Sequence, residues 1–120
     1  MTRTKISIGS KKIGNREPCF IVAEAGINHI GSMIIAKKLI LAAKEAGADA
    51  VKFQIFIPGE VVSKDAAKAD YQKATTGEGS QYKMLKKLAL TDNEFLELKN
   101  YAQKVGIIFF ATPHDLASVD

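Results

Sequence analysis

The segment DAVKFQIFI, residues 49–57, alternates apolar and polar side chains. At successive positions it carries Val51, Lys52, Phe53, Gln54 and Ile55. Because the side chains of a β-strand alternate between the two faces of a sheet, this order predicts a strand over 50–56. The apolar face of that strand would meet helices, and Lys52 and Gln54 would point to the opposite side.

Strand and helix patterns alternate on the amino-terminal side of this segment. The continuous apolar run CFIVA, residues 19–23, predicts a strand with both faces covered, as in a parallel sheet, and it places Cys19 in the core. The periodicity of residues 33–46, between Ser32 as a cap and Gly47 as a terminator, predicts an amphipathic helix. Strand, helix and strand in this order predict a βαβ unit with a right-handed crossover.

The carboxyl-terminal half of the chain continues the alternation after an interruption. The polar stretch 58–79 predicts a long excursion, and loops of this length are often functional. The predicted elements in this half are a short helix near 66–72, helices over 81–90 and 92–105, and a strand over 107–111. A capping box, T-x-x-E from Thr91 to Glu94, supports the start of the last helix, and Asp115 can cap the start of a further one.

The amino-terminal segment ISIGSKKIG, residues 6–14, predicts a short β-hairpin around Gly9 and Ser10. We therefore expect a hairpin with its connector in 1–18 and the first two to three βα units of an α/β fold in 19–120. Such units build either an open doubly wound sheet or a (β/α)₈ barrel. The chain has neither G-x-G-x-x-G nor G-K-[ST], which excludes the dinucleotide fingerprint and the P-loop.

The composition is that of a folded globular protein, because 47% of the 120 residues are hydrophobic and 25% are charged. The net charge of +4 comes from lysines spread over the whole length, so we expect no nucleic-acid binding. A single cysteine excludes an intramolecular disulfide. No apolar run reaches the ~18 to 20 residues that cross a bilayer, and no signal-peptide core is visible, so we expect a cytoplasmic protein without membrane contact.

Polar residues gather at the carboxyl ends of the three predicted strands. Glu24 follows the first strand, Lys52 and Gln54 lie on the second, and Thr112 closes the third. Ligands bind at this edge in barrels and in open α/β sheets. A buried ammonium group needs an anionic partner, which would be Glu24 or a bound anion. The structural alternatives are a Lys52 side chain that reaches solvent and a Thr112 that caps a loop.

Four segments carry motifs that are specific in combination: FIVAEAGINHIGS at 20–32, AKKLILAAKEAGADAVKFQIF at 36–56, KADYQKATTGEGSQYKMLKKLAL at 68–90 and FFATPHD at 109–115. They contain A-E-x-G-x-N-H, A-V-K-F-Q and T-P at characteristic separations. Together they resemble the sialic acid synthase family, which comprises N-acetylneuraminate synthases and their legionaminate and pseudaminate relatives. The resemblance runs from about Ile6 to the end of the chain.

The resemblance implies the N-terminal portion of a (β/α)₈ TIM barrel behind the hairpin. A complete barrel takes roughly 250 residues, so we expect a fragment that lacks the rest of the barrel and the family's C-terminal antifreeze-like domain. The implied enzyme condenses phosphoenolpyruvate with an N-acetylated amino sugar such as N-acetylmannosamine. It releases phosphate and forms a nine-carbon 2-keto sugar acid such as N-acetylneuraminate. The family also implies Mn²⁺ or Mg²⁺, with ligands expected beyond residue 120, and a homodimer of the full-length protein.

The resemblance carries roles to four of the polar residues. Glu24 and Lys52 are the candidate catalytic residues. Glu24 would serve as an acid/base or water-orienting carboxylate, and Lys52 as a fixed positive charge beside phosphoenolpyruvate. Gln54 matches a contact to a sugar hydroxyl, and Thr112 matches a hydroxyl donor beside the phosphate.

The turn after the first strand carries two further candidates. Asn28 and His29 match the family's N-H pair, and they either contact the substrate or stabilise the turn. Ile30 departs from the asparagine that the family usually has at this position. Two other functions stay open: another phosphoenolpyruvate-dependent aldolase, and a non-catalytic half-barrel that serves as an interaction module.

Overall fold

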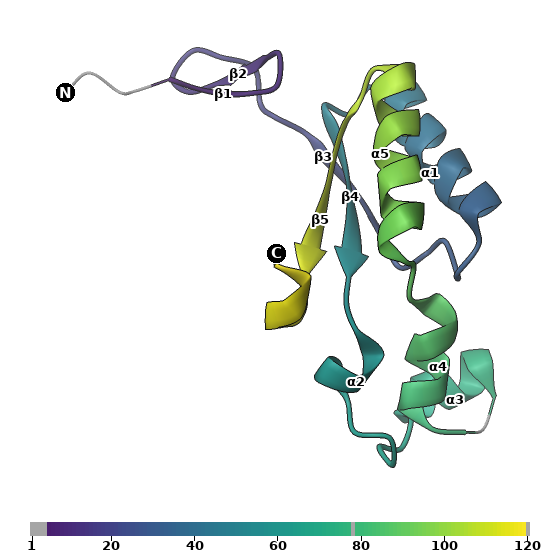
Figure 1. Cartoon of the computed structure of the whole chain (residues 1–120). Coiled ribbons are helices and arrows are strands. Elements are labelled where there is room, and N and C mark those ends of the chain that lie inside the picture. Colours follow the sequence, from purple (N-terminus) through teal and green to yellow (C-terminus); the bar gives the residue numbers. More distant parts are fainter. Residues whose placement is uncertain (1–4, 78, 120) are drawn as a thin grey trace.

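The computed structural model describes residues 5–77 and 79–119, without the side chains of Thr75 and Thr76. It contains a two-stranded hairpin, a parallel three-stranded sheet and a layer of helices (Figure 1). The strands are β1 (Ile6–Ile8) and β2 (Lys11–Ile13) in the hairpin, and β3 (Val22–Gly26), β4 (Ala50–Ile55) and β5 (Ile108–Pro113) in the sheet. β4 lies between β3 and β5 and pairs in parallel with both. The predicted hairpin and the predicted α/β class with a parallel sheet are confirmed.

The helices occupy two places relative to the sheet. α1 (Met33–Glu45) and α5 (Asp92–Val105) lie side by side against one face of the sheet (Figure 1). Beyond the carboxyl ends of the strands lie α2 (Pro58–Val61), α3 (Asp70–Thr76), α4 (Gln81–Leu88) and the 3₁₀ helix η1 (Leu116–Ser118). None of the helices in the described ranges is long and apolar enough to cross a membrane.

The ends of the two long helices follow the predicted capping residues. The Ser32 side chain accepts a hydrogen bond from the Ile35 N–H at 3.3 Å at the start of α1. At the start of α5, the Thr91 hydroxyl accepts the Glu94 N–H at 3.3 Å, and the Glu94 carboxylate accepts the Thr91 N–H at 2.8 Å. This reciprocal pair satisfies two backbone donors that the helix itself leaves free, so the predicted capping box is confirmed.

The hydrophobic core lies between the sheet and the layer of α1 and α5. Val51 and Phe53 on β4, Ile40 on α1 and Leu98 on α5 are fully buried. Each such side chain contributes about 1.5 to 3 kcal/mol by leaving water. The apolar face of β4 therefore meets the helices as predicted, and its intervening side chains point to the other face.

The hairpin lies at the amino ends of the strands, and Asp49 joins it to the sheet. The Lys11 ammonium group is 3.0 Å from one carboxylate oxygen of Asp49, and the other oxygen accepts the Ile21 N–H at 2.8 Å. The turn of the hairpin approaches β5, because a Cβ atom at Gly9 would lie 3.3 Å from the side chain of Ile108. The hairpin therefore contacts the amino end of the sheet, and the polar residues lie toward the carboxyl end.

The first strand begins later than the sequence predicts. It starts at Val22 rather than at residue 19, and Cys19 is exposed rather than buried in the core. Residues 19–21 connect the hairpin to the sheet, and the carbonyl group of Ile21 accepts the N–H groups of Asp49 and Ala50. Val22 is also 39% exposed, so β3 is not covered on both faces within the described residues.

The last strand and the excursion also differ from the prediction. β5 does not break at Thr112, because Thr112 pairs with Gln54 in the ladder and Pro113 ends the strand. Proline fits there because the end of a strand need not donate a ladder hydrogen bond. The stretch 58–79 holds two short helices, α2 and α3, where one near 66–72 was predicted.

Candidate functional site

Four of the predicted site residues form one row on the face of the sheet away from α1 and α5. Glu24 on β3 is the register partner of Lys52 on β4, and Gln54 on β4 is the register partner of Thr112 on β5. Register partners on parallel strands project to the same side of a sheet, so the four side chains share one surface. This surface lies at the carboxyl ends of the strands, where α/β proteins bind ligands.

Lys52 and Glu24 form an ion pair at the β3 side of this row. The Lys52 Nζ lies 2.7 Å from the Glu24 Oε2, and the side chains are 28% and 50% exposed. An ion pair with this much solvent access contributes only about 0 to 1 kcal/mol to stability. The pair therefore mainly orients the Lys52 ammonium group on the exposed face of the sheet. Of the two partners expected for Lys52, Glu24 or a bound anion, the structure shows Glu24.

Gly26 brings the Glu24 carboxylate close to the Gln54 amide. The register between β3 and β4 shifts between Glu24 and Gly26, and Gly26 has φ +54°. A Cβ atom at Gly26 would lie 3.4 Å from the Glu24 Oε1 and 3.5 Å from the Gln54 Nε2. At this shift of the ladder, an acceptor and a donor converge on the space above a glycine. The sequence analysis did not name Gly26 as a site residue. The available signal was the glycine of the A-E-x-G motif, two residues after Glu24.

The turn residues His29 and Asn28 lie in different surroundings. His29 is 1% exposed, its ring stacks on Phe53 with centroids 5.9 Å apart, and its Nδ1 accepts the Gly31 N–H at 3.0 Å. Burial lowers the pKa of His29 below its ordinary value, and the charge of Glu94 opposes this shift. The geometry supports the turn-stabilising alternative for His29. Asn28 is exposed, and contact of either residue with a substrate stays a prediction.

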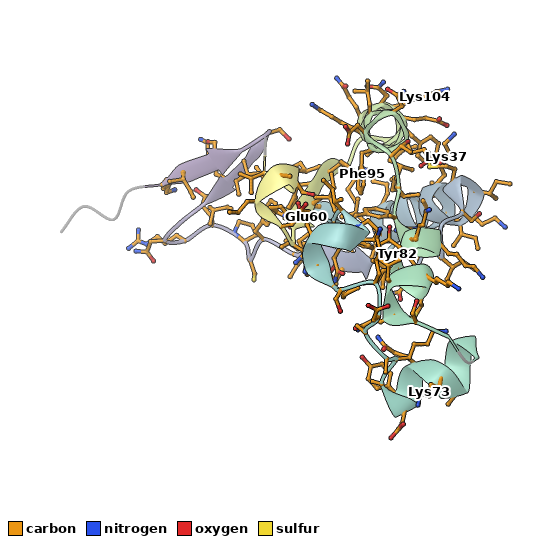
Figure 2. The ribbon with its side chains drawn as sticks, turned by 60° about the horizontal axis from the view of Figure 1, so that its bottom comes forward. Lys37, Glu60, Lys73, Tyr82, Phe95 and Lys104 are labelled. Carbon is orange, nitrogen blue, oxygen red and sulfur yellow. The ribbon has the colours of Figure 1, made fainter. Side chains whose placement is uncertain are left out.

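The excursion borders the same edge of the sheet. It is closed at its base by a bridge between Ala67 and Ser80 and by a hydrogen bond from the buried Lys68 to the carbonyl group of Gly77 at 2.9 Å. Figure 2 shows Glu60 on α2 near the centre of the view and Lys73 on α3 at the far end of the excursion. α2 therefore forms the part of the excursion nearest to the strand ends, where it contacts α4, and α3 lies farther out (Figures 1 and 2).

A cavity of about 690 Å³ lies on the other face of the sheet. Its lining includes Phe56, Leu90, Phe95, Phe109 and Ala111, together with residues of η1. Of these, Leu90, Phe95, Phe109 and Ala111 belong to the helix side of the sheet, with the core, whereas Lys52 projects from the opposite side. The cavity is therefore separate from the polar row.

The described residues do not provide a metal centre of their own. No group of three or more His, Cys, Asp and Glu side chains within 5–77 and 79–119 could hold an ion. The Glu24 carboxylate is paired with Lys52, and the Nδ1 of His29 accepts a backbone hydrogen bond. The chemistry visible in these residues is that of anion binding and of hydrogen bonding to hydroxyl groups.

Comparisons with known proteins give related sequences and structures. The NeuB family model matches residues 39–120. The chain is 48% identical over 113 residues to the N,N'-diacetyllegionaminic acid synthase of Legionella pneumophila, a match that covers 93% of the chain and 32% of that protein. It is 39% identical over 111 residues to the N-acetylneuraminate-9-phosphate synthase of Mus musculus, covering 90% of the chain and 30% of that protein.

A solved structure has the same arrangement of elements. The crystal structure of the N-acetylneuraminic acid (sialic acid) synthetase from Leptospira borgpetersenii serovar Hardjo-bovis, in complex with citrate, matches with a TM-score of 0.78 and 35% identity. The match covers 98% of the chain and 36% of that protein. The chain thus spans about a third of the length of the curated relatives that it matches.

Proposed function

The chain belongs to the NeuB family, and we propose that it supplies the phosphoenolpyruvate-facing part of a sugar acid synthase. The enzyme would join phosphoenolpyruvate to an N-acetylated amino sugar, consume one water molecule, release phosphate and form a nine-carbon 2-keto sugar acid. The parallel sheet would be the first part of a (β/α)₈ barrel in a longer, cytoplasmic, homodimeric protein.

The single observation that carries this proposal is the ion pair between Lys52 and Glu24 on the exposed face of the sheet. A lysine that is 28% exposed and already fixed by a carboxylate can exchange that partner for the anionic groups of phosphoenolpyruvate. The exchange releases the Glu24 carboxylate, which can then accept a proton or orient water beside the sugar. The positive charge stays in place and stabilises negative charge that develops in the reaction.

Gln54 and Thr112 complete the proposed substrate contacts. The Gln54 amide lies beside the Glu24 carboxylate above Gly26, so a sugar hydroxyl there could donate to the carboxylate and accept from the amide. Thr112 would donate its hydroxyl to the phosphate group. A divalent Mn²⁺ or Mg²⁺ ion belongs to the proposal through the family, with ligands outside residues 1–120. Bound there, it would polarise the aldehyde of the sugar.

The proposal is tested by phosphate release from phosphoenolpyruvate with Mn²⁺, in the presence and absence of N-acetylmannosamine. The expected result is release only with the N-acetylated sugar, and a loss of at least about 100-fold in Glu24→Gln and Lys52→Ala. Lys37→Ala is the matched control, because Lys37 pairs with Glu97 on the helix layer away from the polar row (Figure 2). Full activity in both site variants would show that the residue assignment is wrong.

A chimera supplies the parts of a longer relative that lie outside the segment matched by this chain. In it, this chain replaces the matching 113-residue segment of the Legionella pneumophila enzyme, and the same substitutions are introduced. Release stimulated only by a non-acetylated aldose phosphate would favour a related phosphoenolpyruvate-dependent aldolase. An inactive protein that forms a single, cooperatively melting oligomer would favour the non-catalytic interaction module.

A further inference from the structure

The carboxylate of Asp115 joins two segments that leave the sheet at its carboxyl end. Its Oδ2 accepts the Ile57 N–H at 2.8 Å and the Ser118 hydroxyl at 2.9 Å, and its Oδ1 accepts the Ser118 N–H at 2.8 Å. Ile57 follows β4, and Ser118 ends η1 after β5. One side chain therefore connects the segments after two neighbouring strands.

This connection begins where the backbone ladder ends. The last register pair of β4 and β5 is Ile55 with Pro113, and proline has no N–H to donate. The next backbone hydrogen bond runs from the His114 N–H to the Ile55 carbonyl at 3.0 Å. Beyond it, the Ile57 N–H donates a hydrogen bond to the Asp115 carboxylate. A hydrogen bond to a charged group is stronger than one between neutral groups.

The connection lies at the same distance along the chain from two site residues. Gln54 is three residues before Ile57, and Thr112 is three residues before Asp115. Because Gln54 and Thr112 are register partners, the Asp115 hydrogen bond closes the ladder on the carboxyl side of the pair. We propose that Asp115 is a positioning residue, which fixes the separation of Gln54 and Thr112 by holding the segment after β4 against the segment after β5. We call the hydrogen bonds from Ile57 and Ser118 to the Asp115 carboxylate the clamp. Its effect on turnover rests on the proposed function, whereas its existence does not.

The ionised state of Asp115 is the state that the clamp requires. The hydrogen bond from the Ile57 N–H, together with those from Ser118, lowers the pKa of Asp115 below its ordinary value, against a smaller effect of burial. The carboxylate therefore stays charged at neutral pH and can accept all three donors. An asparagine retains one acceptor oxygen, so it preserves part of the clamp, and an alanine removes it.

Asp49 offers a matched control at the opposite end of the sheet. Its carboxylate accepts the Ile21 N–H at 2.8 Å, the same distance as the bond from Ile57 to Asp115. Both aspartates thus connect a strand-flanking backbone N–H to a neighbouring segment. Of the two, Asp115 does so at the end of the sheet where Gln54 and Thr112 lie. A purely structural effect should therefore appear when either aspartate is replaced, and a displacement of Gln54 and Thr112 only when Asp115 is replaced.

The test compares Asp115→Ala, Asp115→Asn and Asp49→Asn in the full chain by NMR. We expect exchange of the Ile57 amide hydrogen to become about tenfold faster in Asp115→Ala, because a hydrogen bond to a charged group is worth at least that factor in the opening equilibrium. The signals of the Gln54 side-chain amide and the Thr112 methyl group should shift or broaden in Asp115→Ala, less in Asp115→Asn, and stay at their wild-type positions in Asp49→Asn. An unchanged exchange rate of the Ile57 amide in Asp115→Ala would overturn the proposal. Changes of the Gln54 and Thr112 signals in Asp49→Asn as large as those in Asp115→Asn would overturn it as well.

Kinetics give a second readout where the wild-type protein releases phosphate. Asp115→Ala should raise the KM for substrate about tenfold with a smaller change in kcat, since misplaced contact residues weaken binding first, and Asp115→Asn should recover part of it. A KM equal to that of Asp49→Asn would overturn the positioning role. If neither this chain nor the chimera releases phosphate with any acceptor, the proposed function fails, and the NMR comparison alone decides on Asp115.

Discussion

The substitution Gly31→Ala probes the contact that seats α4 on the turn after β3. Gly31 has φ +76°, and a Cβ atom built there would lie less than 3.0 Å from the carbonyl oxygen of Lys87, which is closer than real Cβ atoms approach. The neighbour is backbone near the end of a helix, so it cannot rotate away as the tip of a long side chain can. Gly47 is the matched control, because it has φ +84° and a Cβ atom there would meet nothing within 4 Å.

Gly31→Ala and Gly47→Ala both carry the cost of a left-handed backbone, and only Gly31→Ala also carries the cost of steric crowding. A left-handed backbone costs an alanine about 1 to 2 kcal/mol, and both positions carry this cost. Crowding of a well-packed site costs about 1 to 3 kcal/mol more, and only Gly31 carries it. We therefore expect a loss of about 1 to 2 kcal/mol for Gly47→Ala and about 2 to 5 kcal/mol for Gly31→Ala.

Urea unfolding followed by circular dichroism measures both free energies on the same footing. The expected observation is a lower midpoint for Gly31→Ala than for Gly47→Ala at an unchanged slope, which means a change of stability rather than of compactness. Equal losses for the two variants would refute the close packing of the turn against α4. A smaller loss for Gly31→Ala than for Gly47→Ala would refute it as well.

Four further predictions address other parts of the chain. Ile30 has φ +49°, an unfavourable conformation for a β-branched residue, so Ile30→Asn should raise the thermal midpoint by an amount equivalent to about 1 kcal/mol. Thr91→Ala removes the α5 cap and should lower the free energy of unfolding by about 1 kcal/mol, measured in urea. Leu98→Ala opens a cavity in the core and should cost about 2 to 5 kcal/mol in the same assay. The Ile21 N–H is the main cause that lowers the pKa of Asp49 below 3.8, so its stabilisation is present above that pH and is lost as the pH falls through the lowered pKa. Acid titration of Asp49→Asn should therefore show a flatter loss of stability below pH 3.8 than the wild type does.

Local sequence patterns predicted the features that depend on local physics. The alternation around Lys52 assigned the two faces of β4, because the direction of a strand side chain depends only on its position. The capping box at Thr91 fixed the start of α5 for a similar reason, since its two hydrogen bonds join residues three apart. For Lys52, the requirement that a buried ammonium group has an anionic partner left Glu24 and a bound anion as alternatives, and the structure shows the pair with Glu24.

The features that the sequence did not predict depend on contacts between distant segments. The bond from the Ile57 N–H to Asp115 spans 58 positions, and no local pattern marks it. His29 is buried because the turn after β3 folds over Phe53, which the motif alone does not reveal. Cys19 has apolar neighbours in the sequence, yet it lies in the connector after the hairpin, outside the sheet, and is exposed. Burial of this kind is decided by the arrangement of elements.

The central claim is that the ammonium group of Lys52 is the anion-binding group of an exposed polar site. Calorimetric titration of the purified protein with phosphoenolpyruvate tests it, with Lys52→Gln compared against Lys37→Gln. The account predicts that Lys52→Gln weakens the affinity at least about tenfold, which corresponds to about 1.4 kcal/mol, and that Lys37→Gln leaves it within about twofold. Binding of phosphoenolpyruvate by Lys52→Gln with the affinity of the wild-type protein would contradict it.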